Sequence, residues 1–425
     1  MRGAVRSVSL EDALWLNRAS LGKAELLGKI VLLDFFTYGC INCLNVLPDL
    51  ALLEKEFEEE LVIIGVHAGK FAHEKEESAV REAIKRHKIG HAVINDAQHT
   101  YKEAYAIKAW PTQVLINPQG YIVKEYRGEG HLGAIREQIK ALLYSCTPSK
   151  KSFAVKEEEA LPSPLHYPQK IAASAEYLFV SHKDEVLVCS HEGVILHRVT
   201  GLSQPQGMVY IGETLYISSH AGGFITAVSD GFSRQELWLE GLRNPFDLCS
   251  DGQLLYVALA GAHQIKGYDL KSKEVSFVIG NENSESLHDG SYAEAVLAQP
   301  CAMALLDEEL WFVDSESSSL RCAAYGEVTS HLYNDELQHP MGVAAGLYGE
   351  GCGAGRIFIS DSYNNALKVY DPISKELKTL LEGLSEPSGI AKKGCMLYIC
   401  NTNAHEILRY DLSSMHASQL ILKEK

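Results

Sequence analysis

The sequence lacks the long apolar segments that would place it in or across a membrane. No stretch of the 425 residues approaches the roughly 20 apolar residues that a transmembrane helix requires. The first 12 residues contain no apolar run of signal-peptide length and already include Glu11 and Asp12. We therefore expect a protein of the reducing cytoplasm, with no membrane association.

Signatures of metal and phosphate sites are equally scarce. The 17 histidines form no H-E-x-x-H pattern, and a second C-x-x-C pair is missing, so the spacing of zinc sites does not occur. Cys395 and Cys400 are five positions apart in one expected strand, where their side chains would point to opposite faces. The glycine-rich segment 346–355 precedes a strand rather than a helix, so it is interpreted as a surface loop. We expect no bound metal and no cofactor.

Acidic residues outnumber basic ones only in the second part of the chain. Of the 39 Lys/Arg and 55 Asp/Glu, 19 of each lie in residues 1–150, so the whole net charge of −16 lies in residues 151–425. A surface of that sign repels phosphate backbones. We therefore expect protein partners for this part of the chain and no nucleic acid.

A single C-x-x-C pair is the main chemical feature that is present. Cys40 and Cys43 follow the apolar run 30–36, an expected buried strand, and precede apolar residues at helical spacing over 44–57. The pair is thus predicted at a helix N-terminus, where backbone N–H groups and the helix dipole favour a thiolate. Cys40 is expected to be exposed and to attack disulfides, with Cys43 shielded one turn further on. Half of a zinc site is the alternative, although no second ligand pair supports it.

Two further positions agree with redox chemistry. Asp34 lies in the otherwise apolar strand, where burial would raise its pKa and let it accept the proton of Cys43. Trp110 and Pro111 precede the expected strand 113–116, where a thioredoxin-like fold, which this pattern resembles, places a cis proline opposite its cysteine pair. There Trp110 and Pro111 would present backbone to an extended substrate. Each position has a plain alternative, since Asp34 could be a hydrogen-bonded core group and Pro111 a strand-edge breaker.

The other eight cysteines are not expected to form a disulfide framework. Their spacing is irregular, and most lie in apolar strand-like runs, where a free cysteine is a small buried hydrophobic residue. These residues are Cys146, Cys189, Cys249, Cys301, Cys322, Cys352, Cys395 and Cys400.

Residues 1–146 are predicted to form an α/β domain. Besides the strand before Cys40, we expect a strand at 61–66, a charged helix from Glu74 to His87, a hairpin joining 113–116 to 121–123, and a closing helix at 132–143. Residues 147–164 carry charges and prolines without an amphipathic period, so they are interpreted as a linker to residues 165–425.

Residues 165–425 contain six repeats with a period near 40. Each repeat has a proline after a polar turn and then an apolar strand. A residue that is usually small or acidic follows, and an aliphatic residue lies six positions after it. This period, with four short strands per unit, is typical of the blades of an all-β propeller, in which neighbouring blades cover each other's faces. The six prolines are Pro168, Pro205, Pro245, Pro300, Pro340 and Pro387.

Taken together, the chain resembles the NHL repeat-containing protein 2 family over nearly its whole length. The resemblance implies a thioredoxin-like domain followed by a six-bladed NHL β-propeller. The residues that carry it are 34–43, 65–71, 128–131, 161–165, 314–318, 337–340 and 361–364.

Two functions of different classes agree with these features. In the first, the protein is a cytoplasmic thiol–disulfide oxidoreductase in which Cys40 attacks, Cys43 resolves, Asp34 moves the proton, Trp110 and Pro111 hold the substrate, and the propeller recruits a protein client. In the second, the protein is a non-catalytic interaction scaffold whose thioredoxin-like domain binds partners without turnover. The presence of both cysteines and of Pro111 favours the oxidoreductase, and no peroxidase motif occurs.

Overall fold

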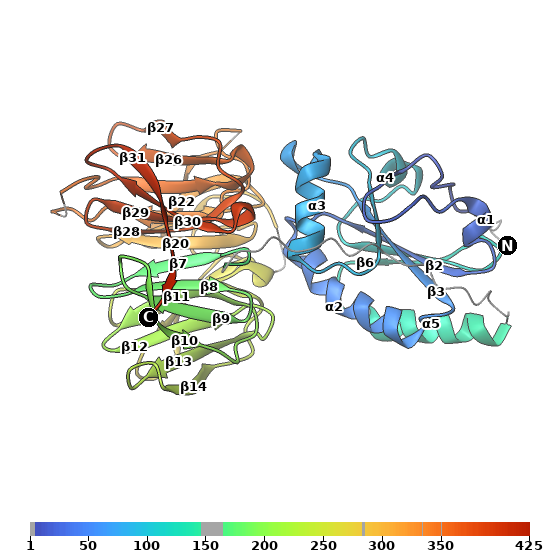
Figure 1. The fold of residues 1–425 in the computed structure, drawn as a ribbon, viewed down its shortest axis with the longest axis horizontal. Helices are drawn as coiled ribbons and strands as arrows, with labels where there is room; N and C mark the ends of the chain where they lie inside the picture. The colour runs from blue at the N-terminus through green and yellow to red at the C-terminus, as the bar shows by residue number, and fades with distance from the viewer. Residues whose placement is uncertain (1–4, 146–164, 283–284, 334, 350) are drawn as a thin grey trace. The chain divides into compact units, whose positions relative to one another are not determined.

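The computed structural model describes residues 5–145, 165–282, 285–333, 335–349 and 351–425 (Figure 1). The chain divides into two compact units, residues 1–161 and 162–425. The expected linker, 147–164, and Cys146 lie outside the described residues. No helix in the described part of the chain is both long enough and apolar enough to span a membrane.

The first unit is built on one six-stranded sheet in the order β1-β4-β3-β2-β5-β6. Strands β2, β3 and β4 are parallel, whereas β1, β5 and β6 pair antiparallel to their neighbours. The strands are β1 (Leu14–Trp15), β2 (Ile30–Phe36), β3 (Leu61–His67), β4 (Ala92–Asn95), β5 (Thr112–Ile116) and β6 (Ile122–Arg127). The helices are α1 (Lys23–Leu26), α2 (Ile41–Glu56), η1 (His73–Lys75), α3 (Glu77–Arg86), α4 (Thr100–Ala104) and α5 (Leu132–Ser145).

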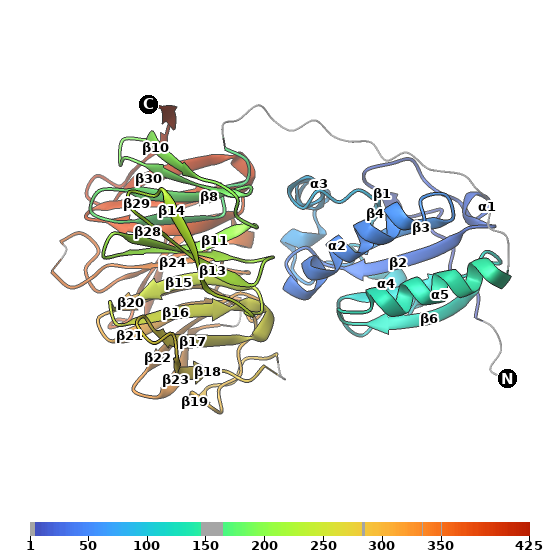
Figure 2. The same ribbon diagram turned by 90° about the horizontal axis from the view of Figure 1, so that it is seen from below.

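The sheet is covered on both faces, which explains the continuous apolar runs of its central strands. Every residue of β2 and β3 is buried. Alternate residues of β2, such as Ile30 and Leu32, pack against α2 and α5, which lie on one face of the sheet in Figure 2. Val31 and Leu33 point to the other face, against the N-terminal segment and α4.

The charged segment after β3 folds differently from the single helix that the sequence predicts over 74–87. It forms the short turn η1 and then α3, with Glu76 extended between them (φ −70°, ψ 131°). The break arises because the side chain of Glu74 turns inward and accepts backbone N–H groups of Lys70 and Phe71 instead of facing solvent.

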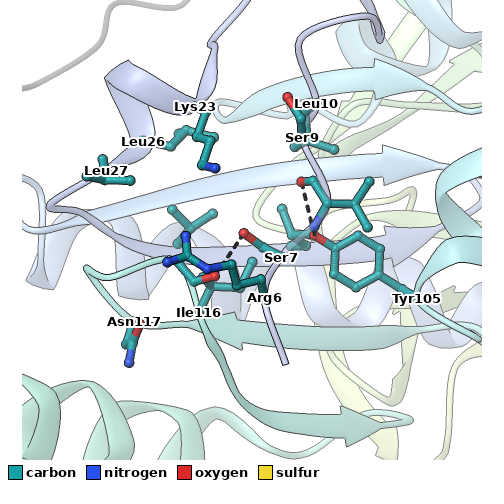
Figure 3. Close-up of a pocket in the computed structure, with 14 residues that line it drawn as sticks. Arg6, Ser7, Ser9, Leu10, Lys23, Leu26, Leu27, Tyr105, Ile116 and Asn117 are labelled. Carbon is teal, nitrogen blue, oxygen red and sulfur yellow. Dashed lines mark hydrogen bonds between the residues drawn. The ribbon is translucent and has the colours of Figure 1, made fainter. Parts of the chain in front are cut away.

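A small cavity lies under the N-terminal segment of this unit (Figure 3). Ser7 is held to the β5–β6 turn because its backbone N–H donates to the carbonyl of Gly120 at 2.9 Å. The space between this segment, α1 and β2 measures about 50 Å³, which is room for a few water molecules. Arg6 and Lys23 lie at its rim, and Leu33 is part of its lining.

In the described part of the second unit, six sheets are arranged as a propeller, as the repeats predict. Each has four antiparallel strands, and two of the sheets carry a short fifth strand. Blades one to three are β7 (Lys170–Ala173), β8 (Leu178–His182), β9 (Glu185–Cys189) and β10 (Val194–Val199); β11 (Pro205–Ile211), β12 (Thr214–Ser219), β13 (Phe224–Ser229) and β14 (Arg234–Leu239); and β15 (Pro245–Ser250), β16 (Leu254–Leu259), β17 (Gln264–Asp269) and β18 (Val275–Ile279).

Blades four to six follow the same plan. They are β20 (Pro300–Leu306), β21 (Glu309–Asp314), β22 (Ser319–Ala324) and β23 (Glu327–Leu332); β24 (Gly342–Ala345), β25 (Ile357–Asp361), β26 (Ala366–Asp371) and β27 (Glu376–Leu381); and β28 (Pro387–Lys393), β29 (Met396–Asn401), β30 (Glu406–Asp411) and β31 (His416–Leu420). Short turns η2 (Ala260–Ala262), η3 (Ser362–Asn364) and η4 (Thr402–Ala404) follow the second strands of blades three, five and six. A two-residue strand, β19 (Gly290–Ser291), adds to blade four.

The polar turn before each repeat proline joins neighbouring blades. The residue before every one of the six prolines has a positive φ, between 45° and 68°. Five of these residues donate their backbone N–H to a side chain of the preceding blade, over 2.9–3.4 Å. The donor and acceptor pairs are Gln204 and Asp184, Gln299 and His263, His339 and Ser318, Glu386 and Asn365, and Tyr167 and His405.

The pair of Tyr167 and His405 joins blade one to blade six and so closes the ring. A second closure comes from β32 (Lys423–Glu424), which pairs in parallel with β10 of blade one. Figure 2 shows this C-terminal segment, in dark red, beside β10. Blade one is therefore joined both to blade six and to the C-terminal strand β32.

Blade four contains a fully buried ion pair. Arg321 and Asp314 are both 0 % exposed, and Nη1 of Arg321 lies 3.0 Å from Oδ2 of Asp314. The same guanidinium donates to Asp289 at 2.9 Å and to the backbone carbonyls of Val296 and His288. Burial raises the pKa of Asp314 to about 6, although Arg321 lowers it. Arg321 thus ties the segment before blade four to its core.

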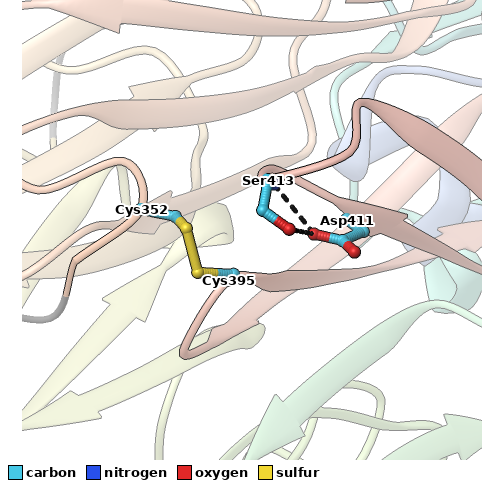
Figure 4. Close-up of a disulfide and its surroundings, with 4 residues drawn as sticks. All are labelled: Cys352, Cys395, Asp411 and Ser413. Atoms are coloured by element: carbon cyan, nitrogen blue, oxygen red, sulfur yellow. Dashed lines mark hydrogen bonds between the residues drawn. A yellow bond between two sulfur atoms is a disulfide. The ribbon is translucent and has the colours of Figure 1, made fainter.

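One disulfide corrects the expectation that the scattered cysteines are free thiols. Cys352, in the glycine-rich insertion of blade five, is bonded to Cys395, in the β28–β29 turn of blade six (Figure 4). The two positions are 43 residues apart, so their spacing gives no sign of contact. The expectation holds for Cys189, Cys249, Cys301, Cys322 and Cys400, which are free and, except for the half-buried Cys249, buried.

Candidate active site

The C-x-x-C pair begins helix α2, as predicted. Cys40 is the N-cap residue, and its carbonyl accepts the backbone N–H groups of Cys43 at 3.0 Å and Leu44 at 3.1 Å. The N–H of Cys40 donates to the carbonyl of Thr37 at 3.3 Å, which closes a tight turn between β2 and α2. The sulfur of Cys40 is therefore carried at the positive end of a 16-residue helix.

The two cysteines differ less in exposure than the sequence suggests. Cys43 is 0 % exposed, as expected of the resolving thiol, but Cys40 is only 5 % exposed rather than open to solvent. The turn that carries Cys40 is pulled inward, because the N–H of Gly39 donates to the buried carboxylate of Glu74 at 3.1 Å. Burial, followed by the hydrogen bond with Cys40, raises the pKa of Cys43 well above its usual value. Cys43 is thus held as a protonated thiol.

Asp34 is buried beside this pair. Its side chain is fully buried in β2, where Oδ1 accepts a hydrogen bond from Nε2 of Gln113 at 2.9 Å. Oδ2 has no hydrogen-bond partner among the described residues. Burial raises the pKa of Asp34 to about 6, against the lowering effects of Gln113 and His91, and the charge of Asp34 contributes to the raised pKa of Cys43. A carboxyl group that titrates near neutrality is suited to exchange a proton with a neighbouring thiol.

The peptide bond between Trp110 and Pro111 is cis, as predicted. Thr112 pairs with Phe35 in the β2–β5 ladder, which places Pro111 beside the end of β2 that leads to Cys40. The Trp110 ring lies among polar neighbours, with Nζ of Lys102 4.5 Å from its centroid.

Two side chains near the pair escaped the sequence analysis. His67, at the end of β3, stacks on the ring of Tyr38 with centroids 5.3 Å apart, and burial lowers the pKa of His67 to about 3, so its ring is neutral. Glu74 is fully buried although its surrounding sequence is highly charged. The apolar run before His67 could have shown that this residue is buried, but nothing in the local pattern distinguishes Glu74 from its exposed neighbours.

No metal centre accompanies these residues. Within the described ranges, no three His, Cys, Asp or Glu side chains are grouped so that they could hold a metal ion. What the site brings together is two thiols, one buried carboxyl group and a cis proline at the end of a strand. This set of groups can accept, hold and release a disulfide bond.

Comparisons with known proteins support the assignment of both units. The thioredoxin-like family model matches residues 28–122. NHL repeat-containing protein 2 of Gallus gallus is 30% identical over 522 aligned positions, which cover 96% of this chain and 70% of the chicken protein. The chain belongs to the NHL repeat-containing protein 2 family. The chloroplastic protein Suppressor of quenching 1 of Arabidopsis thaliana is 29% identical, and the chain spans 47% of its length.

The first unit also resembles enzymes of known chemistry. The thiol-disulfide oxidoreductase ResA of Halalkalibacterium halodurans is 33% identical over 131 residues, covering 31% of this chain and 67% of ResA. The N-terminal unit of this member of the NHL repeat-containing protein 2 family is thus a thioredoxin-like domain related to thiol–disulfide oxidoreductases, with its C-x-x-C pair at Cys40 and Cys43.

Proposed function

We propose that this protein is a cytoplasmic thiol–disulfide oxidoreductase that reduces disulfides in a protein client recruited by the propeller. The observation that carries the proposal is the unequal environment of the two thiols. Cys40 lies at the helix N-terminus and keeps some exposure, whereas Cys43 is completely buried with a raised pKa. That asymmetry separates an attacking thiol from a resolving one.

The reaction proceeds in two exchanges. The Cys40 thiolate attacks one sulfur of the client disulfide, which forms a mixed disulfide and releases the other client sulfur as a thiolate. Cys43 then gives its proton to Asp34 and attacks the sulfur of Cys40. The products are a Cys40–Cys43 disulfide and a client dithiol, and a cellular dithiol donor returns the enzyme to its reduced form.

Trp110 and Pro111 are proposed to hold the client chain during these steps. Pro111 precedes β5 and lies beside the end of β2. Its carbonyl accepts the N–H of Gly128 at 2.8 Å, so the backbone of Trp110 is the part proposed to bind an extended segment approaching Cys40. The acidic propeller is proposed to select the client. In this proposal the first unit supplies the reacting thiols and the second unit recognises the client.

Equilibrium with a redox buffer tests the proposal. The protein is equilibrated with mixtures of reduced and oxidised glutathione and then alkylated. The peptide that contains Cys40 and Cys43 is analysed by mass spectrometry. We expect one two-electron transition between about −270 and about −120 mV, the range of thioredoxin-like oxidoreductases. Cys43→Ser should abolish it. A pair that stays in one state throughout that range would contradict enzymatic turnover.

Asp34→Asn should change both stability and rate with pH. The pKa of Asp34 is about 6 when folded and near 3.9 when unfolded, so the wild type loses about 3 kcal/mol of folding free energy as pH rises from 3.5 to 8. Asparagine does not titrate, so the variant does not lose this folding free energy as pH rises. The stability of the variant relative to wild type should therefore be greater at pH 8 than at pH 3.5 by about 3 kcal/mol, as measured by urea unfolding.

The same variant should reduce a disulfide substrate more slowly at neutral pH, because Cys43 loses its proton acceptor. Gln113→Met, which removes the hydrogen-bond donor to Asp34 and adds no charge, serves as a comparison for disturbance of the pair. An Asp34→Asn rate equal to that of wild type from pH 6 to 9 would remove Asp34 from the mechanism.

A further inference from the structure

Glu74 connects the turn that carries Cys40 to the loop after β3. Its side chain is fully buried. Oε1 accepts the N–H of Gly39 at 3.1 Å, and Oε2 accepts the N–H groups of Lys70 at 2.6 Å and Phe71 at 3.2 Å. One carboxylate therefore binds two separate loops, and one of its partners is the residue immediately before Cys40.

The loop after β3 is shaped to bring this carboxylate close. A Cβ atom added at Gly69 would lie 2.7 Å from Cβ of Glu74 and 3.0 Å from its carbonyl carbon. Such contacts are shorter than real Cβ atoms show, so Gly69 is needed for the close approach of the loop to Glu74. An alanine at position 69 would therefore move Glu74 without altering a charge.

A carboxylate is the side-chain group that fits these donors. Three backbone N–H groups approach the two oxygens of Glu74. A glutamine of the same shape would have to turn its NH2 group toward one of the two loops, where two donors would face each other. The amide oxygen of glutamine is favoured on the side of Lys70 and Phe71, which offer two N–H groups, over the side of Gly39, which offers one. Replacing Glu74 with glutamine is therefore expected to release the Gly39 turn.

We propose that Glu74 is a positioning residue that holds the sulfur of Cys40 at the N-terminus of α2. This inference rests on the proposed function and explains how the attacking thiol is kept in place. Because Gly39 is anchored, Cys40 remains the N-cap residue and its carbonyl keeps the hydrogen bonds from Cys43 and Leu44. If the turn is released, the sulfur moves away from the positive end of α2, which favours the thiolate.

The charge of Glu74 acts in the opposite direction to its positioning effect. A nearby negative charge disfavours a thiolate, so removing charge alone would make Cys40 more reactive at neutral pH. Other titratable and charged groups around the turn include Cys43 on α2, Asp34 on β2, His67 on β3, and Arg86 on α3, which lies over Tyr38. Lys70 and His99 lie beside the loop after β3. These side chains are all present in the Glu74→Gln variant. The direction of the change in Cys40 reactivity therefore separates the loss of a negative charge from the loss of positioning.

The pH dependence of Cys40 alkylation tests the proposal on the full-length protein. The rate of carbamidomethylation of Cys40 by iodoacetamide is followed by mass spectrometry from pH 5 to 9. Glu74→Gln should raise the pH of half-maximal rate by about one unit, which lowers the rate at pH 7 about tenfold because the thiolate is the reactive species. Glu76→Gln is the matched control, since Glu76 is 60% exposed on the neighbouring turn, and it should match wild type.

Two more variants cover the case in which Glu74→Gln does not fold. Gly69→Ala displaces Glu74 and should shift the profile upward with all charges retained. Glu74→Asp keeps the charge on a shorter side chain and should give a smaller upward shift than Glu74→Gln.

A downward shift would show that charge dominates and would overturn the positioning role, as would a profile identical to wild type. In either case a reactive wild-type Cys40 leaves the oxidoreductase proposal standing. If wild-type Cys40 is unreactive across the whole pH range, both proposals fail.

Discussion

Cys43→Ser should convert a transient exchange into stable covalent complexes between Cys40 and its clients, whereas Cys40→Ser should capture almost nothing. The reason is the order of the two steps. In the proposed mechanism Cys40 forms the mixed disulfide, and only the second thiol of the same chain, fully buried at position 43, would break it. With serine at that position, the client stays attached until an external thiol releases it.

The complexes are measured by affinity purification from an alkylated lysate, followed by non-reducing and reducing gels. A Cys40→Ser/Cys43→Ser double variant sets the background. Mass spectrometry of the trapped species should locate the bond at Cys40. Equal trapping by both single variants, or none by either, would favour a scaffold whose thioredoxin-like domain binds partners without turnover.

Arg321→Met is expected to destabilise the propeller by about 3 to 5 kcal/mol. The guanidinium is completely buried, and its removal leaves the carboxylate of Asp314 buried without its charged partner. It also leaves two backbone carbonyls, of Val296 and His288, without their donors. The loss should be smaller at pH 5 than at pH 8, because Asp314, whose pKa is already raised to about 6, is then protonated.

Asp314→Asn/Arg321→Met is the matched comparison, since both charges of the pair are removed together. It should recover a large part of the lost stability, because replacing a buried ion pair by neutral groups often costs little. Urea unfolding of the three proteins measures the effect. If Arg321→Met unfolds at the same urea concentration as wild type, the ion pair does not hold the segment before blade four.

The sequence reveals those parts of the structure whose physical cause is local. Strand β2 is predicted with its observed ends because helices cover both faces of the sheet, which makes the run from Ile30 to Phe36 apolar throughout. The six blades are predicted because each begins with a proline and a polar turn, and the turns prove to bind one blade to the next. The candidate site residues could be chosen from the sequence because their chemistry depends on residue type. They are Cys40, Cys43, Asp34 and Pro111.

The features that the sequence does not reveal depend on contacts between distant segments. Glu74 looks like one more surface acid, because its partners are backbone N–H groups, which leave no trace in the identity of the residues. The limited exposure of Cys40 has the same origin, since Glu74 anchors the turn before it. The disulfide between Cys352 and Cys395 joins two loops of different blades, and no spacing rule relates them.

That disulfide also determines how many electrons the whole chain can take up. A disulfide accepts two electrons on reduction, so the bond between Cys352 and Cys395 forms a second couple beside Cys40 and Cys43. Complete reduction of the fully oxidised chain therefore consumes two equivalents of a dithiol rather than one. The number of dithiol equivalents consumed by the intact protein is therefore the sum for both disulfides. The part that belongs to the C-x-x-C pair is found only when each thiol is assigned to its peptide.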